Sequence, residues 1–214
     1  MTITSPIQTK NASQNVSRET FSRLDAYVSL LLKWNQKINL IGKTTESAVW
    51  ARHIEDSLQL LPLIPDTTKT LADLGSGAGL PGLVIALARP EIAVTLIERD
   101  QRKAAFLTEA TRTLSLTNVA ILAQDITATR ARFDVVTARA LASLSTLCTL
   151  AYPLLGMNAI CLFPKGENLA MELEEAGDKW QFKHASKTSE TSSESCIVSL
   201  SELSPKTTFG MDGI

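Results

Sequence analysis

The sequence predicts an α/β fold: a doubly wound, mostly parallel sheet of seven strands with an N-terminal helical extension. From residue 70 onward, short apolar runs alternate with segments of helical periodicity. This alternation indicates parallel strands joined by right-handed crossovers. The apolar runs lack polar residues at alternate positions, which is typical of strands that helices cover on both faces. Before residue 70 only helical spacing occurs, so we expect no strand in the extension.

The composition limits the class of protein. The 214 residues, of which 44% are hydrophobic, suffice for one such domain and a small accessory element. No apolar run reaches the ~18 residues of a membrane span, and the polar N-terminus lacks a signal-peptide core. We therefore expect a cytoplasmic protein with no membrane partner. Three scattered cysteines without a Cys-x-x-Cys pair, and two distant histidines, indicate reduced thiols and no metal site.

The segment before the sheet divides into two parts. Residues 1–16 are polar and are expected to be disordered. Residues 17–69 form the predicted helical cap. Its first helix is expected over about 17–37, with a serine as N-cap, and its second over about 44–62.

The cap is basic. Residues 10–53 hold seven Lys and Arg against three acids, a balance of +4, whereas the rest of the chain holds 14 against 19, a balance of −5. This asymmetry is compatible with an anionic partner such as RNA, and a solvated helical face explains it equally well. If the partner is RNA, the cap residues expected to meet its phosphates are Lys33, Lys37, Lys43 and Arg52.

The chain is organised around the segment 71–82, whose sequence is LADLGSGAGLPG. A buried strand, expected at 70–75, leads into a glycine-rich turn, and a helix is expected at 80–89. Glycine permits positive φ and lets a ligand approach the main chain closely. The free N–H groups at the start of the next helix complete a ligand cradle.

Two registers of these glycines compete. Gly77-x-Gly79-x-x-Gly82 matches the dinucleotide fingerprint, which indicates a nicotinamide cofactor. Asp73-x-Gly75-x-Gly77-x-Gly79 instead resembles the turn of S-adenosyl-L-methionine (SAM) methyltransferases, where an acid at the strand end favours a cationic ligand. We favour this second register, which assigns cofactor contacts to Asp73, Gly75, Gly77 and Gly79. A glycine turn with only a structural role is the remaining alternative.

The later elements follow in order. Strands are expected at 92–98, 119–123, 133–138, 157–163, 180–185 and 195–201, and helices at 100–115, 143–155 and 168–177. The segment 186–195 is too polar for a core element. The sheet domain thus spans 70–204, and the tail 205–214 is expected to fray.

Polar residues at the carboxyl ends of the strands indicate a shared crevice, because ligands bind there in open α/β sheets. Glu98 is expected to accept hydrogen bonds from ribose hydroxyls, unless it pairs with Arg102 or Lys103 on the surface. Asp125, in the loop 124–127, is either an acceptor for the adenine amino group or an ordinary Asx-turn residue.

Two basic residues end the next strands. Arg139 follows a buried apolar strand, so we expect it to act in the crevice. Lys165 ends the fifth strand and is either an RNA-phosphate contact or an ordinary strand-end lysine.

Strings of residues between positions 20 and 166 resemble one family. They are Trp34-Asn35 with Ile38-Asn39-Leu40, Arg52-His53-Ile54 with Asp56-Ser57-Leu58, Asp73 to Gly82, Arg139-Ala140 and Lys165-Gly166. The sequence is similar to the bacterial ribosomal RNA small-subunit methyltransferase G family, also called glucose-inhibited division protein B. This resemblance implies a Rossmann-like SAM-methyltransferase sheet. It also implies methylation of N7 of one guanosine in small-subunit ribosomal RNA.

The resemblance carries roles for single residues. The cofactor contacts that it implies are Gly75, Leu80, Ile126, Thr127 and Arg139. It implies catalytic roles for Arg139 and His53. It also implies that Arg52 and Asp56 orient the guanine. The alternatives are a surface pair between Arg52 and Asp56, and an ordinary surface position for His53.

The chain departs from the family pattern in two places. Glu98-Arg99 stands where the family has an acid followed by serine, and Asp125-Ile126-Thr127 stands where it has Arg-Ala-Glu. The second departure leaves main-chain groups as the contacts to adenine.

The absence of a nucleophile–base pair from the sequence agrees with the implied target. Guanine N7 is an acceptor without a proton, so its methylation needs no general base. A small-molecule methyltransferase, a nicotinamide oxidoreductase and a non-catalytic RNA- or ribosome-binding protein remain the alternatives. We expect a monomer that acts on small-subunit ribosomal RNA or the assembling subunit, and not on DNA.

Overall fold

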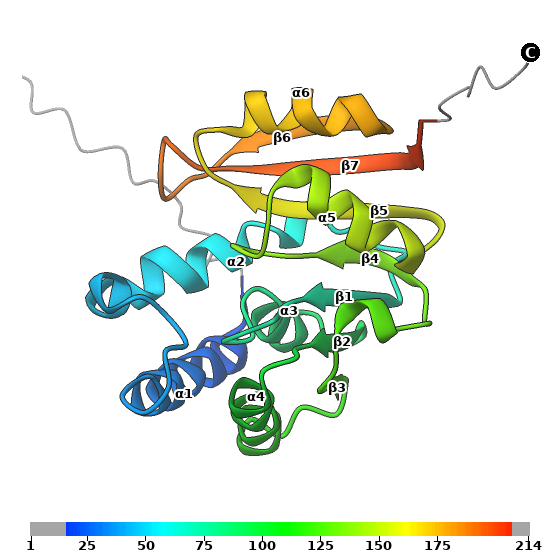
Figure 1. The fold of residues 1–214 in the computed structure, drawn as a ribbon. Coiled ribbons are helices and arrows are strands. Elements are labelled where there is room, and N and C mark those ends of the chain that lie inside the picture. Colours follow the sequence, from blue (N-terminus) through cyan, green and yellow to red (C-terminus); the bar gives the residue numbers. More distant parts are fainter. Residues whose placement is uncertain (1–15, 207–214) are drawn as a thin grey trace, which may run out of the picture.

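The structure, a computed structural model, describes residues 16–206. Seven strands form one sheet (Figure 1): β1 Thr70–Leu74, β2 Ala93–Ile97, β3 Val119–Leu122, β4 Phe133–Thr137, β5 Leu155–Lys165, β6 Trp180–Thr188 and β7 Cys196–Pro205. Their order across the sheet is β3-β2-β1-β4-β5-β7-β6. Strands β1 to β5 are parallel, and β7 runs antiparallel to both of its neighbours. The predicted mostly parallel sheet of seven strands is confirmed.

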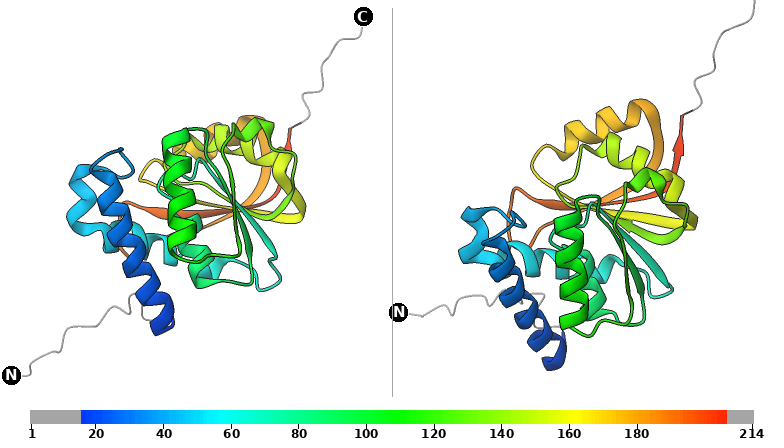
Figure 2. Two further views of the ribbon diagram at one scale, coloured as in Figure 1. Left: turned by 90° about the horizontal axis from the view of Figure 1, so that it is seen from below. Right: turned by 60° about the horizontal axis from the view of Figure 1, so that its bottom comes forward.

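Helices cover both faces of this sheet. Figure 2 shows α1 (Arg18–Asn35), α3 (Gly82–Ala88) and α4 (Gln101–Thr113) on one face, and α5 (Leu144–Ala151) and α6 (Leu169–Lys179) on the other. Successive residues of a strand point to opposite faces. Leu71 therefore joins the apolar cluster under α1, α3 and α4, whereas its neighbour Ala72 joins the cluster under α5 and α6. The expected doubly wound arrangement is thus present.

The first helix of the cap forms as predicted. Ser17 caps it by accepting a hydrogen bond from the Thr20 N–H at 3.0 Å. The helix ends at Asn35, whose side-chain oxygen accepts from the N–H groups of Leu40 at 2.7 Å and Ile41 at 2.9 Å. These bonds turn the chain back toward the sheet. Because α1 packs in the same apolar cluster as α3 and α4, the cap and the sheet share one core.

The second predicted helix, 44–62, is wrong as a single α-helix. The segment consists of short helical turns, namely η2 (Lys43–Ala48, 3-10), η3 (Trp50–Glu55, π), α2 (Asp56–Leu58) and η4 (Leu61–Leu63, 3-10). The 3-10, α and π turns all place apolar residues on one side, so the apolar periodicity of the sequence does not distinguish them. The π turn carries Arg52 and His53, and such turns occur frequently at functional sites.

The two C-terminal strands are longer than predicted. β6 includes the polar residues 186–188, because it is the edge strand and most of its side chains are exposed. β7 continues to Pro205, and the Lys206 N–H donates to the Lys179 carbonyl at 2.9 Å. The expected fraying is therefore wrong for residues 205 and 206. The rest of the tail, and residues 1–15, lie outside the described residues.

Three properties of the described residues bear on the class of protein. Within 16–206, no helix is both long enough and apolar enough to cross a membrane. The cysteines Cys148, Cys161 and Cys196 are free thiols. In the same part of the chain, no group of three or more His, Cys, Asp or Glu could hold a metal ion.

Candidate functional site

The site lies where the strand order reverses, between β1 and β4. Ligands of doubly wound sheets bind at the carboxyl ends of the strands at such a switch point. The glycine turn follows β1, and the segment 139–143 follows β4. Two cavities open there: a first cavity of about 430 Å³ and a second cavity of about 460 Å³. Ala140 borders both cavities, so they adjoin.

Glu98 ties the glycine turn to β2 and borders the first cavity. Its side chain is buried, and its carboxylate accepts the N–H groups of Gly77 and Asp100, both at 2.8 Å. The alternative of a surface pair with Arg102 or Lys103 is therefore wrong, and Arg102 pairs with Asp100 instead. Each carboxylate oxygen of Glu98 retains a second lone pair for a hydroxyl donor.

The glycines of the turn differ in their surroundings. Gly75, Gly77 and Gly79 have positive φ values of 63°, 54° and 83°. A Cβ added to Gly77 would meet no protein atom closer than 3.7 Å, whereas one added to Gly79 would lie 2.4 Å from Leu83. Gly79 thus permits close packing against α3, and Leu80 is buried. Of the glycines and the leucine predicted to contact the cofactor, Gly75 borders the first cavity.

Asp73 is fully buried beneath the turn. Its Oδ2 accepts the N–H of Gly82 at 3.1 Å, and its Oδ1 has no hydrogen-bond partner among the described residues. Burial raises the pKa of this carboxyl to about 7. A buried acceptor without a partner is destabilising, and a donor or cation bound nearby would relieve it.

The loop after β3 contains the expected Asx turn. Oδ1 of Asp125 accepts the N–H of Thr127 at 2.9 Å and its hydroxyl at 2.6 Å. Its Oδ2 lies 4.0 Å from the exposed guanidinium of Arg99. Asp125 and Ile126 border the first cavity. The Asx-turn alternative is confirmed, and a contact of Asp125 with adenine stays a prediction.

Arg139 and His53 meet at the second cavity. Nη2 of Arg139 lies 3.0 Å from Nδ1 of His53, and Nη1 donates to the Arg52 carbonyl at 3.2 Å. Because a guanidinium only donates, Nδ1 must accept, and the imidazole proton is on Nε2. Nε2 then donates to the Thr45 hydroxyl at 2.9 Å, which donates to the Gly42 carbonyl at 2.8 Å. This chain of bonds selects the neutral form of the histidine.

The charge state of this pair follows from burial. His53 is only 8% exposed, so the alternative of an ordinary surface position is wrong. Burial, followed by the charges of Arg139 and Arg52, lowers its pKa to about 4. Within residues 16–206, no carboxylate lies within ion-pair distance of Arg139, and the surface pair of Arg52 with Asp56 is not formed. Burial lowers the pKa of Arg139, and the charge of Asp56 opposes this shift from beyond ion-pair distance. A guanidinium without an ion-pair partner favours an anionic or carbonyl-bearing ligand.

A family model described as rRNA small subunit methyltransferase G matches residues 20–198. The chain belongs to this family. A relative named Ribosomal RNA small subunit methyltransferase G from Rhodospirillum centenum is 47% identical over 196 residues, which cover 91% of this chain and 90% of the relative. One of the same name from Acidiphilium cryptum is 48% identical over 191 residues, which cover 88% of each chain.

Solved structures agree on the fold. A SAM-dependent methyltransferase from Aquifex aeolicus has a TM-score of 0.56 at 14% identity and covers 74% of this chain and 94% of that one. A ribosomal protein L11 methylase from Lactobacillus delbrueckii subsp. bulgaricus has a TM-score of 0.55 at 15% identity, with 73% and 79% covered. As a member of the rRNA small subunit methyltransferase G family, the chain is a methyltransferase. The nicotinamide oxidoreductase and the non-catalytic binding protein find no support.

The predicted RNA contacts of this family member fall into two groups. Lys33, Lys37 and Lys43 are exposed on the cap, where they stay predictions. Lys165 is different, because its Nζ lies 2.5 Å from Glu172 and donates to the Ala142 carbonyl at 3.1 Å. Its side chain is only 10% exposed. Lys165 is thus an internal ion-pair residue at the border of the second cavity rather than an open surface contact.

Sequence patterns alone assign no role to three residues of the candidate site. Ala140 has a positive φ of 53°, which is uncommon for a residue other than glycine. Leu141 covers Gly75, since a Cβ added there would lie 2.7 Å from Leu141 Cδ1. Their position after a strand end is the signal that identifies both. Thr45, the partner of His53, carries no such signal, because their contact depends on the irregular turns of the cap.

Proposed function

We propose that this protein transfers the methyl group of SAM to N7 of a guanosine in small-subunit ribosomal RNA. The observation that best supports this is the junction of the two cavities at Ala140. A cofactor in the first cavity and a base in the second would meet there. The relatives named Ribosomal RNA small subunit methyltransferase G support the choice of RNA.

The residues around the first cavity fit the cofactor. Glu98 keeps lone pairs for ribose hydroxyls, and Ile126 borders the space where adenine would lie. Asp73 lies beneath the glycine turn, outside the lining of this cavity, and has one buried oxygen without a partner. A cationic ligand would favour the charged form of this carboxyl and lower its raised pKa. When bound, SAM supplies a methyl group activated by its positively charged sulfur.

The second cavity suits a reaction that removes no proton. Both ring nitrogens of His53 are engaged, one by Arg139 and one by Thr45, so the histidine orients the arginine and does not act as a base. Guanine N7 already carries a free lone pair. Catalysis then consists of holding N7 in line with the methyl group, and good alignment alone can supply about 7–11 kcal/mol of the barrier.

The basic cap supplies a surface for the rest of the RNA. Lys33, Lys37 and Lys43 are exposed there, and Arg52 borders the second cavity itself. Phosphate contacts of this kind position a nucleic acid without reading its sequence. Recognition of the target base is therefore left to groups inside the second cavity.

The experiment is methylation in vitro with SAM that carries an isotope-labelled methyl group. Small ribosomal subunits, and naked small-subunit RNA, are taken from cells that lack this protein. After digestion, mass spectrometry should find labelled 7-methylguanosine at one position. Arg139→Lys should lower the rate at least about tenfold, while Arg112→Lys, on the exposed side of α4, should not. Label on another atom, or preferential binding of NAD over SAM, would contradict the proposal.

A further inference from the structure

Asp56 differs from the other acids near the site. It is the first residue of α2 and borders the second cavity but not the first. Its Oδ1 accepts a hydrogen bond from the Thr191 hydroxyl. Within residues 16–206, no cation lies within ion-pair distance of Asp56, and its Oδ2 accepts no hydrogen bond. Asp56 therefore presents a carboxylate with unused acceptor capacity to the cavity.

The second carboxylate at this cavity is already engaged. Oε2 of Glu172 lies 2.5 Å from the Lys165 ammonium and accepts the Leu144 N–H at 2.6 Å. These bonds hold α6 to the end of β5 and to the start of α5. Of the two carboxylates that border the second cavity, Asp56 is thus the one left for a ligand.

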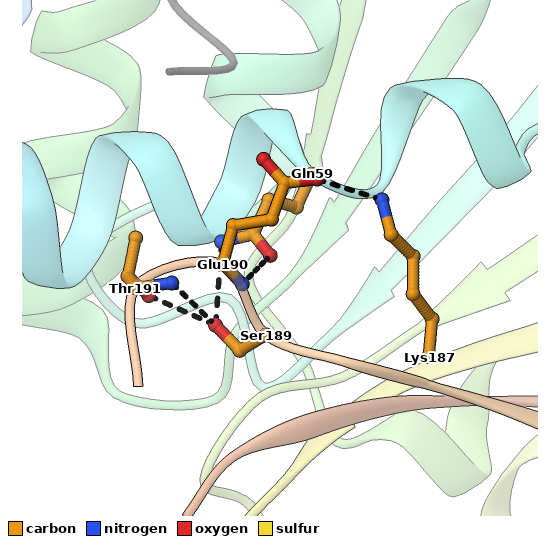
Figure 3. Close-up of polar contacts among 5 residues, drawn as sticks. All are labelled: Gln59, Lys187, Ser189, Glu190 and Thr191. Carbon is orange, nitrogen blue, oxygen red and sulfur yellow. Dashed lines mark hydrogen bonds and ion pairs between the residues drawn. The ribbon is translucent and has the colours of Figure 1, made fainter. Parts of the chain in front are cut away.

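The turn between β6 and β7 fixes the orientation of Asp56. Gln59 accepts the Glu190 N–H at 2.7 Å and donates to the Ser189 hydroxyl at 3.3 Å (Figure 3). The Ser189 oxygen accepts the Thr191 N–H at 3.2 Å and lies 2.9 Å from the Thr191 hydroxyl. Because the Thr191 hydroxyl donates to Asp56, the Ser189 hydroxyl donates to Thr191. A polar network anchored on the cap thus holds Thr191 against Asp56.

The chemistry of guanine matches this arrangement. N7 and O6 are acceptors on one edge of the base, and N1–H and the 2-amino group are donors on another. If N7 faces the junction at Ala140, the donor groups face walls that are farther from the cofactor, and Asp56 belongs to those walls. A carboxylate accepts two neighbouring N–H donors in charge-assisted bonds. Adenine offers no such pair, and inosine lacks the 2-amino group.

We propose that Asp56 selects guanine by accepting hydrogen bonds from N1–H and from the 2-amino group, with Thr191 orienting its carboxylate. The inference rests on the proposed function, because it requires N7 to face the first cavity. It assigns base specificity to the cap and to the β6–β7 turn, not to the residues that hold the cofactor.

The test is equilibrium binding of 5′-GMP and 5′-IMP, measured by calorimetry. The wild type should bind GMP about tenfold more tightly than IMP, the effect of one charge-assisted hydrogen bond. Asp56→Asn should bind both nucleotides with similar affinity, and Thr191→Val should give an intermediate ratio. Asp25→Asn, the same change at an exposed position of α1, should keep the wild-type ratio. If Asp56 had only a structural role, its replacement would weaken the binding of both nucleotides alike. An unchanged ratio of GMP to IMP affinity in Asp56→Asn would therefore overturn the proposal.

Methylation of RNA that carries guanosine or inosine at the target separates this inference from the proposed function. If Asp56→Asn loses the wild-type preference for GMP but the wild type forms no 7-methylguanosine, the proposed function fails, and Asp56 contacts guanine without N7 being the target. If it forms 7-methylguanosine and Asp56→Asn keeps the wild-type preference for guanosine over inosine, the assignment of Asp56 is wrong and the proposed function stands.

Discussion

Lowering the pH should destabilise this protein through His53. Replacing His53 by a side chain that does not titrate should remove that effect. Burial, with the nearby charges of Arg139 and Arg52, lowers the pKa of His53 from 6.5 to about 4. Between these values the unfolded chain binds a proton that the folded chain does not. The free energy of unfolding therefore falls as the pH falls through this range.

The size of the effect follows from the shift. One unit of pKa difference corresponds to ~1.4 kcal/mol. Because the ring borders an open cavity and solvent screens part of the interaction, we expect a loss of about 1–2 kcal/mol between about pH 7 and 4.5. Asp73 acts in the opposite sense, since its raised pKa of about 7 lets the folded state take up a proton first. A comparison of variants that all keep Asp73 cancels this contribution.

The assay is urea denaturation, followed by tryptophan fluorescence, at about pH 7, 5.5 and 4.5. His53→Gln keeps an acceptor for Arg139 but does not titrate, so it should lose about 1–2 kcal/mol less than the wild type on acidification. His184→Gln, at an exposed position of β6, should follow the wild type. Parallel losses in the wild type and His53→Gln would refute the neutral, buried state of His53.

Gly77→Val should abolish SAM binding in calorimetry, because a side chain at this position would occupy the space of the ligand and strain a backbone with a φ of 54°. The protein should still fold, because an added Cβ would meet no protein atom closer than 3.7 Å. Unchanged affinity would place the cofactor elsewhere. Glu98→Ala should weaken SAM binding by about 1.5–3 kcal/mol, and a loss below about 0.5 kcal/mol would leave Glu98 only its bonds to the turn. Joint replacement of Lys33, Lys37 and Lys43 by Glu should weaken RNA binding and flatten its salt dependence without changing SAM affinity. An equal loss of RNA affinity and SAM affinity would indicate that these lysines have a structural role. The single-turnover rate should be flat between about pH 6 and 9, because N7 loses no proton, and a tenfold rise per pH unit would show that the target atom is not N7.

The sheet is predictable from the sequence because its signals are local. Apolar runs identify β1 to β5, and the turn after β1 needs glycine at three positions of positive φ. β6 is predicted too short because an edge strand keeps polar side chains in water, so its residues 186–188 carry no apolar signal. The prediction of a single helix over 44–62 is wrong for another reason. Its 3-10 and π turns share the one-sided apolar pattern of an α-helix.

The site is predictable only in outline. Their positions at strand ends place Glu98 and Arg139 at the borders of the two cavities, since the topology of the sheet brings such positions together. The partners of these residues do not follow from local patterns. His53 and Arg139 are 86 positions apart, and their contact buries a histidine that helical spacing alone would leave on the surface. Asp56 depends in the same way on Thr191, which is 135 positions away.

The helical cap lines the second cavity and contacts the glycine turn that leads to the first. The Tyr27 hydroxyl of α1, which is fully buried, donates to the Ala78 carbonyl of the glycine turn at 2.6 Å. Burial raises the pKa of this hydroxyl, so it stays a donor under all ordinary conditions. On the other side, His53 of the same cap orients Arg139 in the second cavity. A cap that served only to recruit RNA would need neither contact. Because both exist, the cap is in direct contact with the glycine turn and with Arg139, and its packing helps to fix the position of each.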